Sequence, residues 1–120
     1  MEFFDHDILN GYVSIYQRQI TFNSKLLKYF EDCLKVRVGF EVENRKIYVF
    51  LLDADHVKSG EIKESSLLSV KTSKTYARIS STNLMRQISK ALNIVFDDKP
   101  VKYETTWDDN QNILVIHTGK

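Results

Sequence analysis

The residue types best suited to catalysis or metal binding are few in this 120-residue chain and lie far apart. The three histidines, His6, His56 and His117, are not spaced with the single cysteine, Cys33, as ligands of one metal ion. The chain has neither a glycine-rich phosphate loop nor a Gly-x-Ser-x-Gly nucleophile elbow. The sequence therefore predicts a protein that is not an enzyme and holds no cofactor or metal.

Two carboxylate pairs, Asp97 with Asp98 and Asp108 with Asp109, are the remaining candidates for acid and base chemistry. Both pairs fall in expected turns, where nothing nearby would desolvate them and separate their pKa values. We interpret them as solvated turn formers. Cys33 falls on the apolar side of an expected helix and is interpreted as a small core residue rather than a nucleophile.

The cationic residues carry more information than the net charge of +1. Residues 8–30 and 65–92 contain no acid, and the acids concentrate between and around these two stretches. If both stretches share one surface, they would suit the phosphate backbone of a duplex. Solvated helix faces that carry lysine are the alternative interpretation. The cations that we expect to contact phosphates are Arg18, Lys74, Arg78, Arg86 and Lys90.

Aromatic residues stand beside some of these cations. Tyr16 lies two positions before Arg18, and Tyr76 lies two positions before Arg78. Such pairs suit contacts with either a nucleic acid or a partner protein. Trp107, just before an expected turn, is either an edge residue that covers a hairpin or an exposed anchor for a partner.

A pattern that occurs twice must position these residues. Each copy has a short strand, a helix cap, an amphipathic helix and an alternating hairpin, and such a unit is too small to bury its own apolar face. The chain is therefore predicted to be one domain over residues 1–120, with repeat one at 12–52, a linker at 53–66 and repeat two at 67–118. The expected helices are 25–34 and 83–92, and the expected hairpin strands are 36–42, 47–51, 101–107 and 113–116.

Local signals define the ends of the two helices. Asn23 or Ser24 is expected to cap the first helix, and Ser81 or Thr82 the second, because a short side-chain acceptor satisfies amides at a helix start. Asn93 stands where a left-handed helix end is favoured.

Spacing also predicts which residues face the core. The apolar stripe of the first helix is Leu26, Leu27, Phe30, Cys33 and Leu34, and the inward residues of the following strand are Val36, Val38, Phe40 and Val42. Residues 67–70 are expected to form a strand that mirrors residues 12–15. The opening segment, residues 1–11, is expected to pack on the body of the domain.

Composition restricts the setting of the protein. With 42% hydrophobic and 28% charged residues, the chain is ordinary for a globular domain, and one cysteine excludes an internal disulfide. The N-terminus has no basic run before an apolar stretch, and no window approaches ~20 apolar residues. The sequence thus predicts a cytoplasmic protein without membrane association.

Several short motifs resemble one known family. The runs Ala91-Leu92-Asn93-Ile94, Asp98-Lys99-Pro100-Val101 and Ile20-Thr21-Phe22-Asn23 resemble the AbrB and MraZ type of swapped-hairpin domain. The resemblance covers roughly residues 12–118 and implies an α+β fold, in which two strand-helix-hairpin copies form one swapped-hairpin β-barrel. Asn23 and Ser81 stand where that family usually has proline.

The resemblance also carries a functional expectation. Members are mostly DNA-binding regulators or antitoxins that use basic residues near the first hairpin, and Arg18 with Lys74 or Arg78 would be the counterparts of those residues. A small, lysine- and asparagine-rich, duplicated chain is also similar to proteins of phages and mobile elements. The predicted function is therefore a small regulator of a phage or mobile element that binds double-stranded DNA.

A protein-binding function is the alternative. In it the chain inhibits a host defence system, as an anti-CRISPR protein does, or another host component, and docks through Tyr16, Tyr76 and Trp107. Short hairpin edges of this architecture also suit pairing between subunits, so a homodimer is a further expectation.

Overall fold

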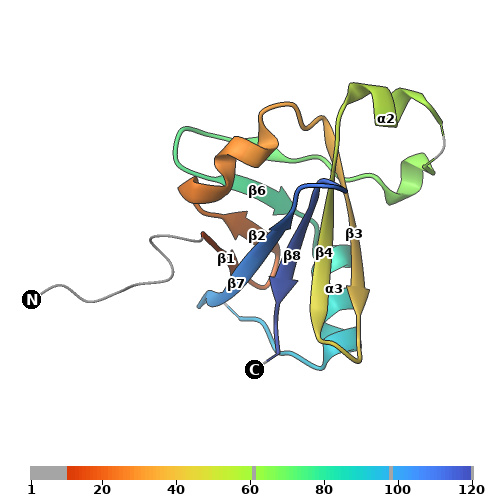
Figure 1. The fold of residues 1–120 in the computed structure, drawn as a ribbon. Coiled ribbons are helices and arrows are strands. Elements are labelled where there is room, and N and C mark those ends of the chain that lie inside the picture. Colours follow the sequence, from red (N-terminus) through yellow and green to blue (C-terminus); the bar gives the residue numbers. More distant parts are fainter. Residues whose placement is uncertain (1–10, 61, 98, 120) are drawn as a thin grey trace, which may run out of the picture.

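A computed structural model describes residues 11–60, 62–97 and 99–119. The protein is a small α+β domain whose regular secondary structure is mostly strands of one curled sheet, a half-barrel with few helices (Figure 1). The α+β class predicted from sequence is confirmed. The expected packing of the opening segment falls on residues 1–10, which lie outside the described ranges.

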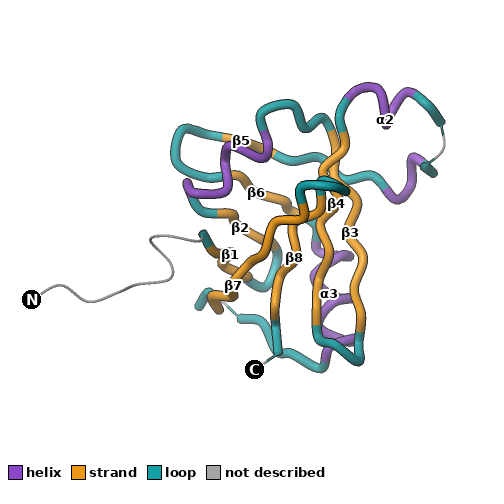
Figure 2. The backbone as a smooth tube through the Cα atoms, viewed as in Figure 1, coloured by secondary structure: helices purple, strands orange, loops and turns teal. Residues whose placement is uncertain are grey.

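The elements follow one another in the order strand, strand, helix and hairpin, and this order occurs twice. The first series is β1 (Tyr12–Ile15), β2 (Gln19–Phe22), the 3-10 helix η1 (Ser24–Phe30), β3 (Lys35–Glu41) and β4 (Lys46–Leu52). The second is β5 (Lys71–Thr72), β6 (Ala77–Ser80), α3 (Thr82–Leu92), β7 (Val101–Asp108) and β8 (Ile113–His117). Between them lie α2 (Ala54–Lys58) and the 3-10 helix η2 (Glu64–Ser66), which stand apart from the strands in Figure 2.

Pairs of neighbouring strands come alternately from the first and the second series in the sheet. The strand order is β3-β4-β8-β7-β1-β2-β6-β5, and every pairing between these strands is antiparallel. The hairpin β7–β8 thus separates β4 from β1, although β1 to β4 are consecutive along the chain. A single bridge between Val36 and Leu68 links β3, at one end of this order, to the segment just before β5, at the other.

Two ladders, β2–β6 and β4–β8, pair equivalent strands of the two series. β2 and β6 face each other about the pair Thr21 and Arg78, and β4 and β8 face each other about the pair Tyr48 and Val115. The flanking positions are core pairs: Ile20 with Ile79, Phe22 with Ala77, Ile47 with Ile116 and Val49 with Leu114. Because side chains alternate along a strand, these four pairs all lie on the inner face of the sheet.

Helices complete the core. α3 contributes Met85, Ile88 and Leu92, which are fully buried. η1 contributes Leu26 and Phe30, and the Phe30 ring lies 5.0 Å from the Phe22 ring on β2. Burial of such side chains stabilises the fold by roughly 1.5–3 kcal/mol each. The two helices thus pack on the same apolar core from different parts of the chain.

The first predicted helix is wrong in length and type. Residues 24–30 form a 3-10 helix, and the chain has left it by Leu34, which is 48% exposed although the spacing placed it on the apolar face. The backbone N–H of Leu34 donates to the carbonyl of Leu52 at 2.7 Å, because the chain is already pairing with β4 there. Strand pairing therefore outweighs the apolar helical spacing at the end of this segment.

The cap predicted for that helix is also wrong. Asn23 occupies the N-cap position, but its side chain makes no capping bond and accepts instead from the backbone N–H of Tyr12 at 3.2 Å. At the second helix the prediction is confirmed: the Ser81 side chain accepts from the Leu84 N–H, and Asn93 adopts a left-handed φ of 54°.

Two strand predictions need correction. Val42 is 56% exposed rather than inward, since β3 ends at Glu41 and the chain then turns. Residues 67–70 make only the bridge at Leu68 rather than a strand, and β5 begins at Lys71. The remaining predicted hairpin strands agree with β3, β4, β7 and β8 to within two residues at each end.

Candidate functional site

Three of the predicted phosphate-contacting cations line one groove. Arg18, in the turn between β1 and β2, meets Arg86 and Lys90 of α3 around a hollow of about 450 Å³. The other lining residues are Gln17, Thr82, Met85, Ser89 and Phe96. We call this hollow the α3 groove.

Backbone hydrogen bonds fix the turn against the start of the helix. The Tyr16 N–H donates to the Gln19 carbonyl at 2.9 Å and closes the turn, and the Ser81 N–H donates to the Arg18 carbonyl at 3.2 Å. Ser81 also caps α3 by accepting from the Leu84 N–H at 3.1 Å. The position of Arg18 is therefore tied to the first turn of the helix that bears the other two cations.

The helix presents its cations through its own periodicity. Met85 and Ile88 are buried in the core, while Arg86 and Lys90 are exposed. Residues four positions apart lie one turn above each other on the same face of a helix, so the two cations border the groove together. Ser89, three positions after Arg86, also lines the groove, and its hydroxyl donates to the Ile94 carbonyl.

The groove carries positive charge. None of the residues that line it is an acid, and within residues 11–60, 62–97 and 99–119 none of its three cations belongs to an ion pair. Asp97 borders the adjoining hollow beside Arg18, and its side chain accepts from the backbone N–H of Lys99 at 2.8 Å. Three cations gathered without a neutralising partner create a local positive potential that attracts anions.

The other two predicted cations lie elsewhere. Arg78 is on β6, and its side chain is on the sheet face opposite to its buried neighbours Ala77 and Ile79. Lys74 is exposed in the turn between β5 and β6, which Ser73 holds by accepting from the Tyr76 N–H. The sequence grouped all five cations, and the fold places three of them in the α3 groove.

The aromatic residues singled out from the sequence are dispersed. Tyr16 borders a hollow beside Arg18, and Tyr76 is 37% exposed at the start of β6. Trp107 stacks on Tyr29 of η1 with 4.1 Å between ring centroids and an interplanar angle of 18°. Its indole N–H donates to Asp109 at 3.3 Å. These residues do not form a single aromatic patch.

Sequence reasoning missed the polar lining of the α3 groove. Ser89 follows Arg86 by three positions, which places it on the same side of the helix, so helical spacing alone would have found it. Gln17 and Phe96 carry no such signal, because they reach the groove through the β1–β2 turn and the loop after α3. Only tertiary structure brings those loops to the helix.

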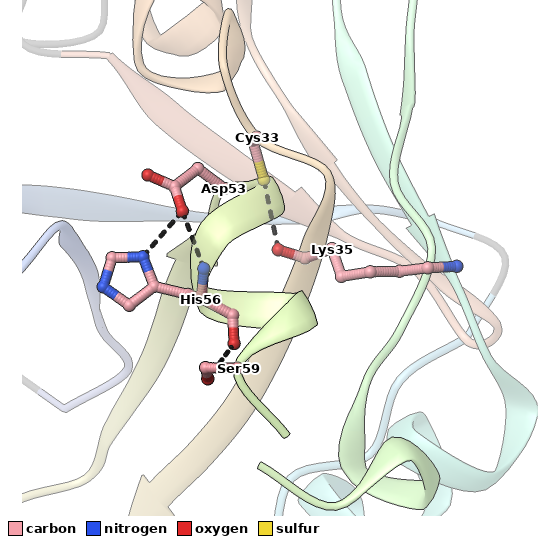
Figure 3. Close-up of polar contacts among 5 residues, drawn as sticks. All are labelled: Cys33, Lys35, Asp53, His56 and Ser59. Carbon is pink, nitrogen blue, oxygen red and sulfur yellow. Dashed lines mark hydrogen bonds and ion pairs between the residues drawn. The ribbon is translucent and has the colours of Figure 1, made fainter. Parts of the chain in front are cut away.

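Cys33 and Asp53 border one hollow, and Asp53 contacts His56, but none of the contacts drawn in Figure 3 joins Cys33 to either residue. The Cys33 thiol donates to the Lys35 carbonyl at 3.3 Å, and burial raises its pKa to about 11. Because the thiolate is the reactive form, this cysteine is a poor nucleophile at neutral pH. The environment thus agrees with the interpretation of Cys33 as a core residue.

Asp53 and His56 have a structural role at α2. Asp53 accepts from the His56 backbone N–H at 3.0 Å and lies 2.7 Å from its ring Nδ1, and the backbone bond is the main cause of a lowered pKa at Asp53. Ser59 closes the same helix by donating to the His56 carbonyl. The described parts of the chain contain no group of three histidine, cysteine or carboxylate residues placed to hold a metal.

Comparison with known proteins adds no relative. No protein-family model, curated protein or solved structure matches the chain. Among the described residues, no helix is long and apolar enough to cross a membrane. The α3 groove is therefore the basis for a functional assignment.

Proposed function

We propose that this protein is a small regulator that binds double-stranded DNA, with the phosphate backbone in the α3 groove. The observation that carries the proposal is the convergence of Arg18, Arg86 and Lys90 from two separate elements on one groove whose lining contains no acid. Arginine offers a planar fork of donors that matches phosphate oxygens, and lysine offers a point charge. The side-chain amide of Gln17 adds a further donor, whereas the Ser89 hydroxyl already donates to the Ile94 carbonyl.

The pairing of strands supports a swapped-hairpin architecture as part of this proposal. If two copies of one unit exchange hairpins about a two-fold axis, each contact should occur twice, once from each copy. β1 of the first copy pairs with β7 of the second through Val13 and Tyr103. The equivalent contact would join β3 of the first copy to the segment before β5 of the second, and the bridge between Val36 and Leu68 lies there. The ladders β2–β6 and β4–β8, which pair equivalent strands, lie where such an axis would pass.

Counterion release sets the expected energetics. Each phosphate neutralised on duplex DNA contributes about −0.9 to the slope of log K against log salt concentration, so three groove contacts contribute about −2.7. A contact from Lys74 would steepen the slope further. Because these contacts are to the backbone, we expect binding with little dependence on base sequence.

The test is a fluorescence-anisotropy titration of the full chain against labelled duplex DNA at low salt. We expect the triple variant Arg18→Ala, Arg86→Ala, Lys90→Ala to weaken binding at least about tenfold, since three phosphate contacts are lost. The matched control removes the same charge at three exposed cations outside the groove: Arg37→Ala, Lys58→Ala and Lys63→Ala.

Circular dichroism of both triple variants establishes that they fold. Equal binding by the groove variant and the wild type would overturn the groove as the DNA site. Equal loss in the groove and control variants would show that net charge, and not the groove, governs affinity.

A protein partner is the second candidate, and the Tyr29–Trp107 stack favours it. Hollows of about 530 Å³ and about 350 Å³ border this pair on two sides. Tryptophan and tyrosine are enriched among the residues that carry most of the binding energy of protein interfaces. In this proposal the chain inhibits a host component. The protein would then not bind duplex DNA, and the Trp107→Ala variant would no longer bind the partner protein.

A further inference from the structure

A second cationic surface crosses the outer face of the sheet. Lys102 of β7 is opposite Ser14 of β1, Ser14 is opposite Thr21 of β2, Thr21 is opposite Arg78 of β6, and Arg78 is opposite Lys71 of β5. Directly opposite residues of neighbouring strands project from the same face of a sheet. We call these five residues the outer row; Figure 1 shows the strands β7, β1, β2 and β6 in succession, and Figure 2 adds β5.

Burial identifies the face on which the outer row lies. The residues that alternate with it along β1, β2 and β6 are fully buried in the core: Val13, Ile15, Ile20, Phe22, Ala77 and Ile79. The outer row is therefore on the opposite side, where Lys71 and Lys102 are exposed and Ser14, Thr21 and Arg78 are half-buried. The row holds three cations, two hydroxyl groups and no acid.

Tyrosines flank the outer row on one side. Tyr12 precedes Ser14 by two positions along β1, so it shares the outer face. Tyr76, which is 37% exposed, lies just before β6 and two positions before Arg78. The Lys102 Nζ lies 4.5 Å from the centroid of the Tyr12 ring, which places that ring beside the row. Glu104, opposite Tyr12, is the one acid next to these residues in the β1–β7 ladder.

Arg78 is incompletely satisfied in the free protein. Its Nε atom is buried without a hydrogen-bond acceptor within the described ranges, and no carboxylate there pairs with its charge. A buried donor without a partner is rare and costs free energy. Because no carboxylate of the described residues neutralises Arg78, its charge remains available to an anion on the outer face.

We propose that this face binds single-stranded nucleic acid, with phosphates along the outer row and bases on Tyr12 and Tyr76. Neighbouring strands lie about 4.8 Å apart, so the row extends about 19 Å from Lys102 to Lys71. That length, together with cations beside aromatic rings, suits a strand whose bases are unpaired and free to stack. A duplex hides its base faces and would leave both tyrosines unused.

This site is distinct from the α3 groove and goes beyond the function proposed for it. The outer row projects from the sheet face, whereas the groove lies between the β1–β2 turn and α3. Because the two sites share no residue, variants of one leave the other in place.

The experiment is an anisotropy titration of a labelled oligothymidine of about 12 nucleotides, within the site sizes typical of such surfaces. For the variant Lys71→Ala, Arg78→Gln, Lys102→Ala, we expect the slope of log K against log salt to become shallower by about 2, from three lost single-strand phosphate contacts. The variants Tyr12→Leu and Tyr76→Leu should each weaken binding by about 5- to 150-fold, the range for one stacked base.

The matched control is the groove variant Arg86→Ala, Lys90→Ala, which should bind the oligothymidine like the wild type. Since Arg78 is half-buried, the double variant Lys71→Ala, Lys102→Ala repeats the test with exposed residues alone. The proposal is overturned if the folded wild type does not bind the oligothymidine, or if outer-row variants bind it unchanged. Duplex binding, measured separately with the groove variants, succeeds or fails independently.

Discussion

Gly11 begins the described chain and immediately precedes β1, with a φ of +75°. A Cβ atom added there would lie 2.7 Å from Leu26 Cδ2, 3.0 Å from Leu26 Cγ and 3.2 Å from the Asn23 side-chain oxygen. Leu26 is buried in the core, and the Asn23 oxygen accepts from the Tyr12 N–H, so neither has room to move freely. Gly11→Ala therefore combines a disfavoured backbone conformation with a steric clash.

Gly60 provides a matched control for the backbone contribution. Its φ is +76°, but a Cβ atom there would meet nothing within 4 Å. A non-glycine residue in the left-handed region costs roughly 1–2 kcal/mol, and overpacking a core site costs about 1–3 kcal/mol more. We expect Gly60→Ala to destabilise by about 1–2 kcal/mol and Gly11→Ala by about 2–5 kcal/mol.

Urea denaturation followed by circular dichroism measures both free energies of unfolding. The double variant Gly11→Ala, Leu26→Ala should lose less stability than the sum of its two single variants, because the truncated leucine no longer meets the new methyl group. If Gly11→Ala costs no more than Gly60→Ala, or if the double variant is strictly additive, the close packing of Gly11 on η1 is refuted.

Three further predictions concern the groove helix, the cysteine and the core. Ser81→Ala should cost about 1 kcal/mol in the same denaturation assay, since it removes the α3 cap; an unchanged midpoint would contradict that role. Alkylation of Cys33 by iodoacetamide should be slow at pH 8 and accelerate towards pH 11, because its folded pKa is about 11. Because the Cys33 thiol loses its proton less readily in the folded state, the free energy of unfolding is unaffected below the unfolded pKa of 9.0 and should fall as the pH rises through the folded pKa of about 11. Rapid alkylation at pH 8 would contradict the burial of Cys33. Ile79→Ala should lower the free energy of unfolding by about 2–5 kcal/mol, because Ile79 is fully buried in the core. A loss below about 1 kcal/mol would contradict its packing in the core between β2 and β6.

The second helix shows what the sequence could reveal. Met85, Ile88 and Leu92 recur at helical spacing, Ser81 caps the start, and Asn93 takes the left-handed end, so local chemistry and tertiary packing agree. The hairpins were predictable for the same reason, because alternation of apolar residues matches the inner face of the sheet. Where local and tertiary preferences coincide, one chain is enough to predict an element.

The first helix shows why the rest was beyond the sequence. Leu34 continues the apolar spacing of η1, yet it lies just before β3, where its backbone N–H already donates to the Leu52 carbonyl of β4. Arg78 belongs to an acid-free stretch together with Arg86, but strand alternation sends it to the outer face, while Arg86 borders the α3 groove. Linear charge patterns show that cations cluster, and only the topology of the sheet decides which of them share a surface.

The salt dependence of duplex DNA binding tests the central claim most directly. The equilibrium constant should be measured by anisotropy over a series of salt concentrations for the wild type and for Arg18→Ala, Arg86→Ala, Lys90→Ala. We predict a linear fall of log K with log salt for the wild type and a slope shallower by about 2.7 for the variant. Equal slopes, or the absence of duplex binding by the folded wild type, would contradict DNA binding in the α3 groove.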